Sequence, residues 1–143
     1  MAHTYRLGFW RRSINRILGG LLRLGVSPAH TYLLTVSGRK TGRPYSTPVR
    51  LVEEHGRRWL VAPYGAVGWV RNARAAGEVI LRRGRRSETV KIIETQPEEA
   101  APVLKSYIEQ VPITRPFFDV TPKSRIEDFV AEAPRHPVFR VLR

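Results

Sequence analysis

The amino-acid sequence predicts an α+β fold that is mainly β, in which short antiparallel strands form a small barrel or a strongly curled sheet. The 143 residues suit one domain, and 42% of them are apolar, which is enough for a single core. Short runs rich in β-branched, aromatic and aliphatic residues alternate with tight turns, as is typical of strands joined by hairpins. A closed sheet is expected because closure removes the exposed edges of such strands.

The first half of the chain is expected to hold one helix and a three-stranded meander. Isoleucine and leucine recur at spacings of three and four over residues 9–24, which predicts an amphipathic helix with arginines beside its other face. Gly25 and Pro28 end this helix. The expected strands are residues 31–37, 47–53 and 58–63, with a turn at residues 55–57 between the last two.

The second half is expected to mix helices and strands. Residues 67–77 have helical spacing and end at Gly77, and strands follow at residues 78–81 and 87–94, joined by a tight turn. A helix begins at Pro97 and runs to about residue 110, since proline fits the first helical turn. Ser124 and Glu127 have capping-box spacing at the start of a helix over residues 124–133. Residues 138–142 are expected to form a last strand.

These elements predict one domain over residues 1–143, with an N-terminal helix in residues 1–26, a barrel core in residues 31–94, and C-terminal helices with the last strand in residues 97–143. No apolar segment approaches the roughly 20 residues that span a bilayer, and no signal peptide is evident. The lack of cysteine excludes a disulfide framework and thiolate chemistry and permits a reducing compartment. The predicted location is cytoplasmic.

The charge of the chain is large and uneven. The formal net charge is +13, and residues 1–91 hold eighteen lysines and arginines against four acids, a balance of +14. The remaining residues are close to neutral. A field of one sign attracts polyanions over long distances. The charge therefore favours nucleic acid, anionic lipid, or a phosphorylated or polycarboxylated small molecule as the partner.

One stretch, SGRKTGRPYSTPV over residues 37–49, has the composition of an anion-binding loop. Gly38 and Gly42 allow backbone N–H groups to turn towards a ligand. Arg39 and Lys40 supply a bidentate fork and a point charge for a phosphate group. The alternative is a hairpin loop whose charges only keep the protein soluble.

Two later segments favour a ligand site. The sequence APYG, residues 62–65, ends the third strand, and a meander brings it alongside the loop. The next helix begins with Gly68 and Trp69, and its N-terminal end is electropositive. Trp69 offers a flat surface for a planar ring, whereas its alternative role is core packing.

Hydrolytic and metal-binding patterns are not found in the sequence. The four histidines, His3, His30, His55 and His136, are scattered, and each is expected to be an isolated surface or turn residue. The carboxylates cluster in the C-terminal helices, where they are expected to form solvated faces, so no metal site and no two-carboxylate glycosidase site is predicted. Walker-type and dinucleotide-binding patterns are also missing.

Three segments in order, TVSGRKTGRPYSTPV, WLVAPYG and GWVRNARAAGEVILRRG, resemble the deazaflavin-dependent nitroreductase family. Its members are reductases that use coenzyme F420 and occur mainly in actinobacteria. The resemblance covers roughly residues 31–94. It implies a split β-barrel of the flavin-reductase or FMN-binding type, which agrees with the strand order above.

The resemblance also implies a cofactor site with a phosphate side. Tyr45 stands where members often place an arginine for the phosphate, and Arg43 is a nearby substitute. The F420 phosphodiester and its tail of several glutamates match the basic first half of the chain. The residues implied on the phosphate and tail side are Arg39, Lys40, Gly42, Arg43, Arg71 and Arg74.

The ring side of the implied site follows from the same three segments. Side chains after the loop would line the deazaflavin and its ribityl chain, the strand end would flank the ring through its backbone, and the helix would close the pocket. The implied residues are Ser46, Thr47, Pro48, Ala62, Tyr64, Gly65, Trp69 and Asn72.

The sequence therefore predicts an F420-dependent oxidoreductase. Reduced F420 would pass a hydride to an activated C=C bond, in an enone or an unsaturated lactone or ester, or to a quinone, and the cofactor would carry the chemistry. Tyr64 is the candidate proton donor, with solvent as the alternative. Family members often have a tyrosine on the C-terminal helices near the substrate, where this chain has Phe117 and Phe118.

Three alternatives stay open at this point. The barrel could bind F420, FMN or haem without catalysis. The basic chain could bind nucleic acid, with Trp59, Trp69 and Tyr64 stacking on bases. The helix over residues 9–24 could lie on the inner face of the membrane, which would suit a quinone acceptor. A monomer and a homodimer are both compatible with the sequence.

Overall fold

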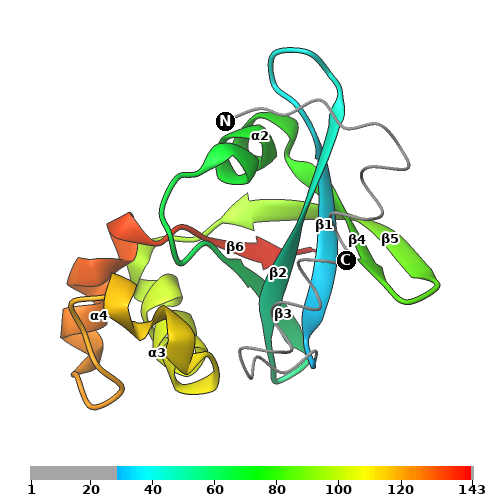
Figure 1. The fold of residues 1–143 in the computed structure, drawn as a ribbon. Coiled ribbons are helices and arrows are strands. Elements are labelled where there is room, and N and C mark those ends of the chain that lie inside the picture. Colours follow the sequence, from blue (N-terminus) through cyan, green and yellow to red (C-terminus); the bar gives the residue numbers. More distant parts are fainter. Residues whose placement is uncertain (1–28, 143) are drawn as a thin grey trace.

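The computed structural model describes residues 29–142, which form a closed six-stranded antiparallel barrel with the strand order β1-β2-β3-β6-β5-β4 (Figure 1). This confirms the predicted mainly β barrel. The sixth strand, from the C-terminal segment, pairs with both β3 and β5 and so completes the ring. The strands are β1 Thr31–Ser37, β2 Pro44–Glu54, β3 Arg57–Val61, β4 Glu78–Arg83, β5 Arg86–Glu94 and β6 Val138–Val141.

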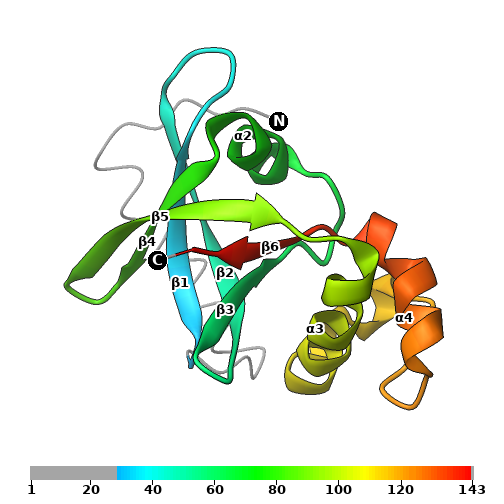
Figure 2. The same ribbon diagram turned by 180° about the vertical axis from the view of Figure 1, so that it is seen from behind.

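The helices occupy two places around the barrel. Helix α2 (Gly68–Ala76) packs at one end, beside the loop that joins β1 and β2. Helices α3 (Pro97–Gln110) and α4 (Ile126–Glu132), with the short 3-10 helices η1 (Pro112–Phe117) and η2 (Ala133–Arg135), cover one side of the barrel. The β4–β5 hairpin projects on the opposite side (Figure 2). The predicted helix over residues 9–24 lies outside the described residues.

The interior of the barrel is filled by every second residue of its strands. Leu34 from β1, Leu51 from β2, Leu60 from β3 and Leu81 from β4 are almost completely buried there, together with Phe139 from β6. Helix α2 inserts two further side chains, Val70 and Ala73, into the same cluster. Because these two residues are fully buried, α2 acts as a plug at this end of the barrel.

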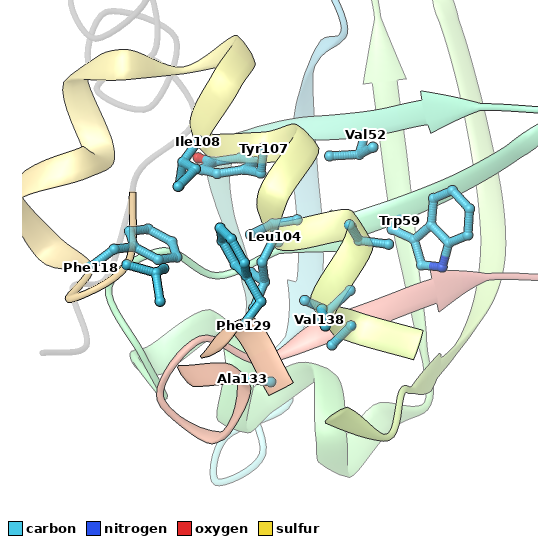
Figure 3. Packing of buried hydrophobic residues seen from close by; sticks show 14 of the residues in the cluster. Val52, Trp59, Leu104, Tyr107, Ile108, Phe118, Phe129, Ala133 and Val138 are labelled. Atoms are coloured by element: carbon cyan, nitrogen blue, oxygen red, sulfur yellow. The ribbon is translucent and has the colours of Figure 1, made fainter. Parts of the chain in front are cut away.

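A second core lies between the outer surface of the barrel and the C-terminal helices (Figure 3). Trp59 and Val61 of β3 point outward into it, while Leu60 between them points inward. Both faces of β3 are therefore buried over residues 59–61, which explains why these three residues are all apolar and do not alternate with polar ones. Leu104 of α3 and Phe129 of α4 fill the centre of this core.

Two predicted boundaries differ from the structure for clear reasons. Strand β2 begins at Pro44, because Pro44 pairs with Ser37, so part of the predicted loop is strand. The capping box predicted from Ser124 and Glu127 is wrong by one residue. The backbone N–H of Arg125 donates to the Asp128 carboxylate over 3.1 Å, whereas the Ser124 hydroxyl accepts from the N–H of Thr121.

The second core yields a stability prediction. Phe129→Ala removes a completely buried ring and leaves a cavity, so it should lower the free energy of unfolding by about 3–5 kcal/mol. Ile126→Ala on the same helix is the matched control, because Ile126 is 42% exposed and should change stability by less than about 0.5 kcal/mol. Urea unfolding measures both, and equal effects would contradict this packing.

Candidate functional site

Three segments that the sequence singled out lie at one end of the barrel. They are the basic loop, which we define as residues 38–43 between β1 and β2, the strand-end segment, residues 62–65 after β3, and helix α2 (Figure 1). The strand-end segment leads directly into α2, where the N–H of Val67 donates to the carbonyl of Gly65. A buried side chain of α2 joins the helix to the basic loop.

Arg39 and Asn72 tie the basic loop to α2. The backbone N–H of Arg39 and its guanidinium Nη1 both donate to Oδ1 of Asn72, over 3.1 and 2.9 Å. Asn72 is only 6% exposed, whereas Arg39 and Lys40 are exposed. A buried amide thus fixes the start of the loop and leaves its cations at the surface. Arg39 and Asn72 were both predicted for the site from the sequence, and the structure places them in direct contact.

The loop itself is a tight turn. The N–H of Gly38 donates to the carbonyl of Arg43 over 2.7 Å, and the N–H of Gly42 donates back to the carbonyl of Gly38 over 2.9 Å. Gly42 has a φ of 73°, which other residues rarely adopt. A Cβ at Gly38 would lie 2.5 Å from Cε2 of Tyr45, so the Tyr45 ring packs directly on the first residue of the loop.

The three β2 residues implied on the ring side do not share one face of the strand. Thr47 pairs with Leu34, a core residue, and so faces the barrel interior. Ser46 pairs with Thr35 on the outer face, where the two hydroxyl oxygens lie 2.5 Å apart. Pro48 is on the same outer face, because side chains alternate along a strand. A ligand on the outer face therefore meets Ser46 and Pro48 but not the side chain of Thr47.

The strand-end segment combines a buried start with an exposed aromatic residue. Ala62 is 1% exposed, and Gly65 has a φ of 86°. Tyr64 between them is 57% exposed, and its ring meets Phe117 of η1 edge-to-face at 4.7 Å between centroids. Phe117 is also more than half exposed. The two rings form an apolar surface beside the strand-end segment, and the Tyr64 ring carries its hydroxyl group there.

Helix α2 presents different residues to the core and to the surface. Trp69 is partly buried, and its ring lies 6.1 Å from that of Phe139, so it packs on the barrel core. Arg71 is exposed. Arg74 makes two hydrogen bonds to the carboxylate of Glu94, over 2.8 and 2.7 Å, and this carboxylate raises the pKa of Arg74. Arg74 was predicted to bind the anionic tail of the cofactor, and it could do so only if its ion pair with Glu94 opened.

The sequence analysis was wrong about His136 and Glu132. His136, expected as an isolated surface or turn residue, is 3% exposed, and Glu132, expected on a solvated face, is 2% exposed. His136 Nε2 lies 2.7 Å from Oε2 of Glu132, and Nδ1 lies 2.8 Å from the carbonyl oxygen of Pro63. The spacing of four residues between Glu132 and His136 could have indicated their contact from the sequence. The contact with Pro63 depends on the fold and has no local signal.

Trp59 is not placed for the alternative role of stacking on bases. It is 8% exposed and donates from Nε1 to Glu99 over 3.0 Å.

Tyr107 of α3 is buried, and burial raises the pKa of its hydroxyl, with the nearby Tyr64 contributing in the same direction. Its hydroxyl is thus a weaker acid than an ordinary phenol.

The sequence comparison decides the family. The family described as F420H(2)-dependent quinone reductase matches residues 10–115, which is most of the chain. The chain belongs to this family. It is therefore an oxidoreductase of the F420H2-dependent quinone reductase family, whose hydride donor is F420H2. No curated protein was found to match the chain.

Solved structures agree on the fold. A structure of an F420-H2 dependent reductase, FDR-A, is 24% identical, with 80% of this chain and 95% of that chain covered and a TM-score of 0.56. A structure described as a domain-swapped dimer is 24% identical, covering 94% and 98% of the two chains, with a TM-score of 0.57. A pyridoxinephosphate oxidase family protein from Clostridium acetobutylicum is 11% identical, covering 90% and 82%, with a TM-score of 0.50. This F420H2-dependent quinone reductase family member thus has the split-barrel fold.

The basic loop of this family member offers the kind of hydrogen-bond donors that bind a phosphorylated cofactor. Arg39 and Lys40 are exposed cations on a loop held by Asn72, and α2 has no acidic residue in its first turn.

Within residues 29–142, no helix is both long enough and apolar enough to cross a membrane. The same residues contain no group of three potential metal ligands.

Asn72 gives a prediction about the basic loop. Asn72→Ala removes the acceptor of two hydrogen bonds, so amide hydrogen exchange at residues 38–43 should accelerate, and stability should fall by about 1–3 kcal/mol. Asn72→Asp keeps an acceptor oxygen opposite Arg39 and should retain most of the protection. If exchange in the loop is unchanged in Asn72→Ala, the loop does not depend on this contact.

Proposed function

We propose that reduced F420 binds at this end of the barrel and that the protein uses it to reduce a quinone or an activated C=C bond. The observation that carries the proposal is the Arg39–Asn72 contact, because it fixes an exposed basic loop against the helix that follows the strand-end segment. A phosphate side and a ring side are thereby held at a constant distance. The family membership supplies the identity of the hydride donor.

The phosphate side of the proposed site is the basic loop and the start of α2. Arg39 and Lys40 provide exposed positive charge, and Gly42 allows the turn that presents the backbone to an anion. The first N–H groups of α2 add a partial positive charge. Arg43 and Arg71 are exposed cations nearby that suit the glutamate tail of the cofactor.

The ring side is the strand-end segment with the outer face of β2. Gly65 has no side chain, so a planar ring can approach its backbone closely, whereas buried Ala62 supports the site from behind. Ser46 and Pro48 offer a hydroxyl and an apolar ring on the neighbouring strand. Thr47 and Trp69 face the barrel core, and their proposed part is to support the site from behind.

The acceptor is proposed to dock on the Tyr64–Phe117 surface. Two exposed aromatic rings in contact bind a flat apolar molecule such as a quinone or an enone well, because stacking and burial both contribute. F420H2 supplies the hydride when bound. Tyr64 holds a proton on an exposed hydroxyl next to this surface and can donate it to the reduced acceptor. Buried Tyr107 is a less suitable acid.

Loss of charge in the basic loop should weaken cofactor binding. Arg39→Ala and Lys40→Ala should each raise the dissociation constant of F420 by about 10-fold, as expected for loss of one charge-assisted hydrogen bond. Arg85→Ala, in the turn between β4 and β5, removes the same charge elsewhere and is the control. Fluorescence titration of F420 at two salt concentrations measures the effect. An equal effect of all three variants would mean that only net charge matters.

Turnover tests the catalytic part. The wild-type protein should oxidise F420H2, followed by absorbance, with a simple quinone and with a cyclic enone. Tyr64→Phe should lower kcat for the enone by at least about 10-fold, because the carbanion formed needs a positioned acid, and should leave F420 affinity within about 2-fold. Tight binding of F420 with no turnover on either acceptor would instead indicate a carrier.

A further inference from the structure

A buried pair of ionisable residues lies directly behind the strand-end segment. Glu132 at the end of α4 and His136 just before β6 are almost completely inaccessible to solvent. The function proposed above does not use either of them. In both ribbon views, the turn that holds His136 runs beside the connection from β3 to α2 (Figures 1 and 2). Buried ionisable groups are rare unless they are paired, so their position requires an explanation.

The hydrogen-bond partners define the state of His136. Nδ1 faces the carbonyl of Pro63 over 2.8 Å, and Nε2 faces the carboxylate of Glu132 over 2.7 Å. The carbonyl of Pro63 can only accept, so Nδ1 carries a proton and donates to it. Nε2 and the Glu132 carboxyl group share the second hydrogen bond, and the ring stacks on Phe118 at 3.8 Å between centroids, which fixes its plane.

Other groups hold Glu132 in its place against His136. The guanidinium of Arg135 donates to Oε1 of Glu132, and the backbone N–H of Asp119 donates to Oε2 over 3.3 Å. Arg135 also pairs with the carboxylate of Asp119 over 2.8 Å. Both oxygens of Glu132 are thus bound by groups from other segments, which fixes the carboxyl group opposite Nε2 of His136.

Pro63 is the point at which this cluster meets the proposed ring site. The β3–β6 ladder pairs Val61 with Val138, and the N–H of Ala62 then donates to the carbonyl of Pro137 over 2.9 Å. Pro63 has no N–H, so the backbone ladder cannot continue through it. The carbonyl oxygen of Pro63 is hydrogen-bonded by the His136 side chain and so is held in place.

We infer that His136, held by Glu132, is a positioning residue for the deazaflavin ring. This inference rests on the proposed function. The carbonyl of Pro63 and the N–H of Tyr64 belong to one planar peptide unit, so a bond to the carbonyl also sets the direction of the N–H. A hydrogen bond to the carbonyl polarises this unit and makes its N–H a stronger donor. The C-terminal segment thus controls a backbone contact with the ring without touching it.

Two substitutions at one position separate the two bonds of His136. The amide of His136→Asn can take the place of Nδ1 and donate to Pro63, but it does not reach Glu132. The amide of His136→Gln can take the place of Nε2 and donate to Glu132, but it leaves Pro63 without a donor. His136→Gln should raise the dissociation constant of F420 by about 10-fold or more, whereas His136→Asn should change it by less than about 3-fold.

The free protein provides a readout that does not depend on turnover. Nitrogen NMR of the wild-type protein at neutral pH should show a proton on Nδ1 of His136. The Gly65 amide donates to the carbonyl of Ala62 over 3.3 Å, across the Pro63–Tyr64 peptide unit, so its hydrogen exchange should accelerate in His136→Gln and stay slow in His136→Asn. Urea unfolding shows that each variant is folded. Arg125→Gln removes an exposed cation at the start of α4, outside this cluster, and should leave F420 affinity unchanged within about 2-fold.

The possible results are distinguishable. Equal F420 affinity in both His136 variants and the wild type would overturn the inference and leave the proposed function intact. An unprotonated Nδ1 in the wild type would also overturn it, even if one variant failed to fold. If the wild-type protein did not bind F420, the proposed function and this inference would both be wrong. Selective weakening in His136→Gln with slow Gly65 exchange in His136→Asn would support it.

Discussion

Closure of the barrel by β6 is the constraint on which the rest of this structure depends. The strand is only four residues long, yet it supplies the backbone partners of both β3 and β5. Because β6 follows α3 and α4 in the chain, its insertion also brings these helices against the outer face of β3. The second core, the Phe117 ring and the Glu132–His136 pair all reach their positions in this way.

The proposed site is consequently assembled from two parts of the chain that differ in character. The N-terminal part contributes glycines, cations and hydroxyl groups, which suit a phosphorylated and polar cofactor. The C-terminal part contributes aromatic rings and the buried Glu132–His136 pair, which suit an apolar acceptor and a rigid wall. Some of the arginines elsewhere are paired with carboxylates. Arg58, for example, makes a bidentate pair with Glu88 and lowers the pKa of that carboxyl.

The sequence predicted the fold well because its signals are local. Glycine turns, strand-like runs and the proline at the start of α3 each specify an element without reference to the rest of the chain. The basic loop and Asn72 could be named for the same reason, through the resemblance of contiguous segments. The direct bond between Arg39 and Asn72 could not be predicted, since it joins residues 33 positions apart.

The largest error of the sequence analysis concerned polar residues inside the C-terminal half. A histidine and a glutamate four residues apart look like one face of a solvated helix, and composition favours that interpretation. Their burial depends on contacts with other segments, such as the Phe118 ring that stacks on His136, and such contacts have no local signal. The split of Ser46 and Thr47 between two faces of β2 was predictable from strand alternation, once the strand was known to begin at Pro44.

The late position of β6 has a consequence for synthesis on the ribosome. Until residues 138–141 emerge, β3 and β5 each present an open edge of unpaired N–H and C=O groups, and such edges pair readily with other chains. The nascent barrel therefore passes through a state prone to aggregation or to exchange of the last strand between molecules. Pairing of residues 138–141 with β3 and β5 covers both edges.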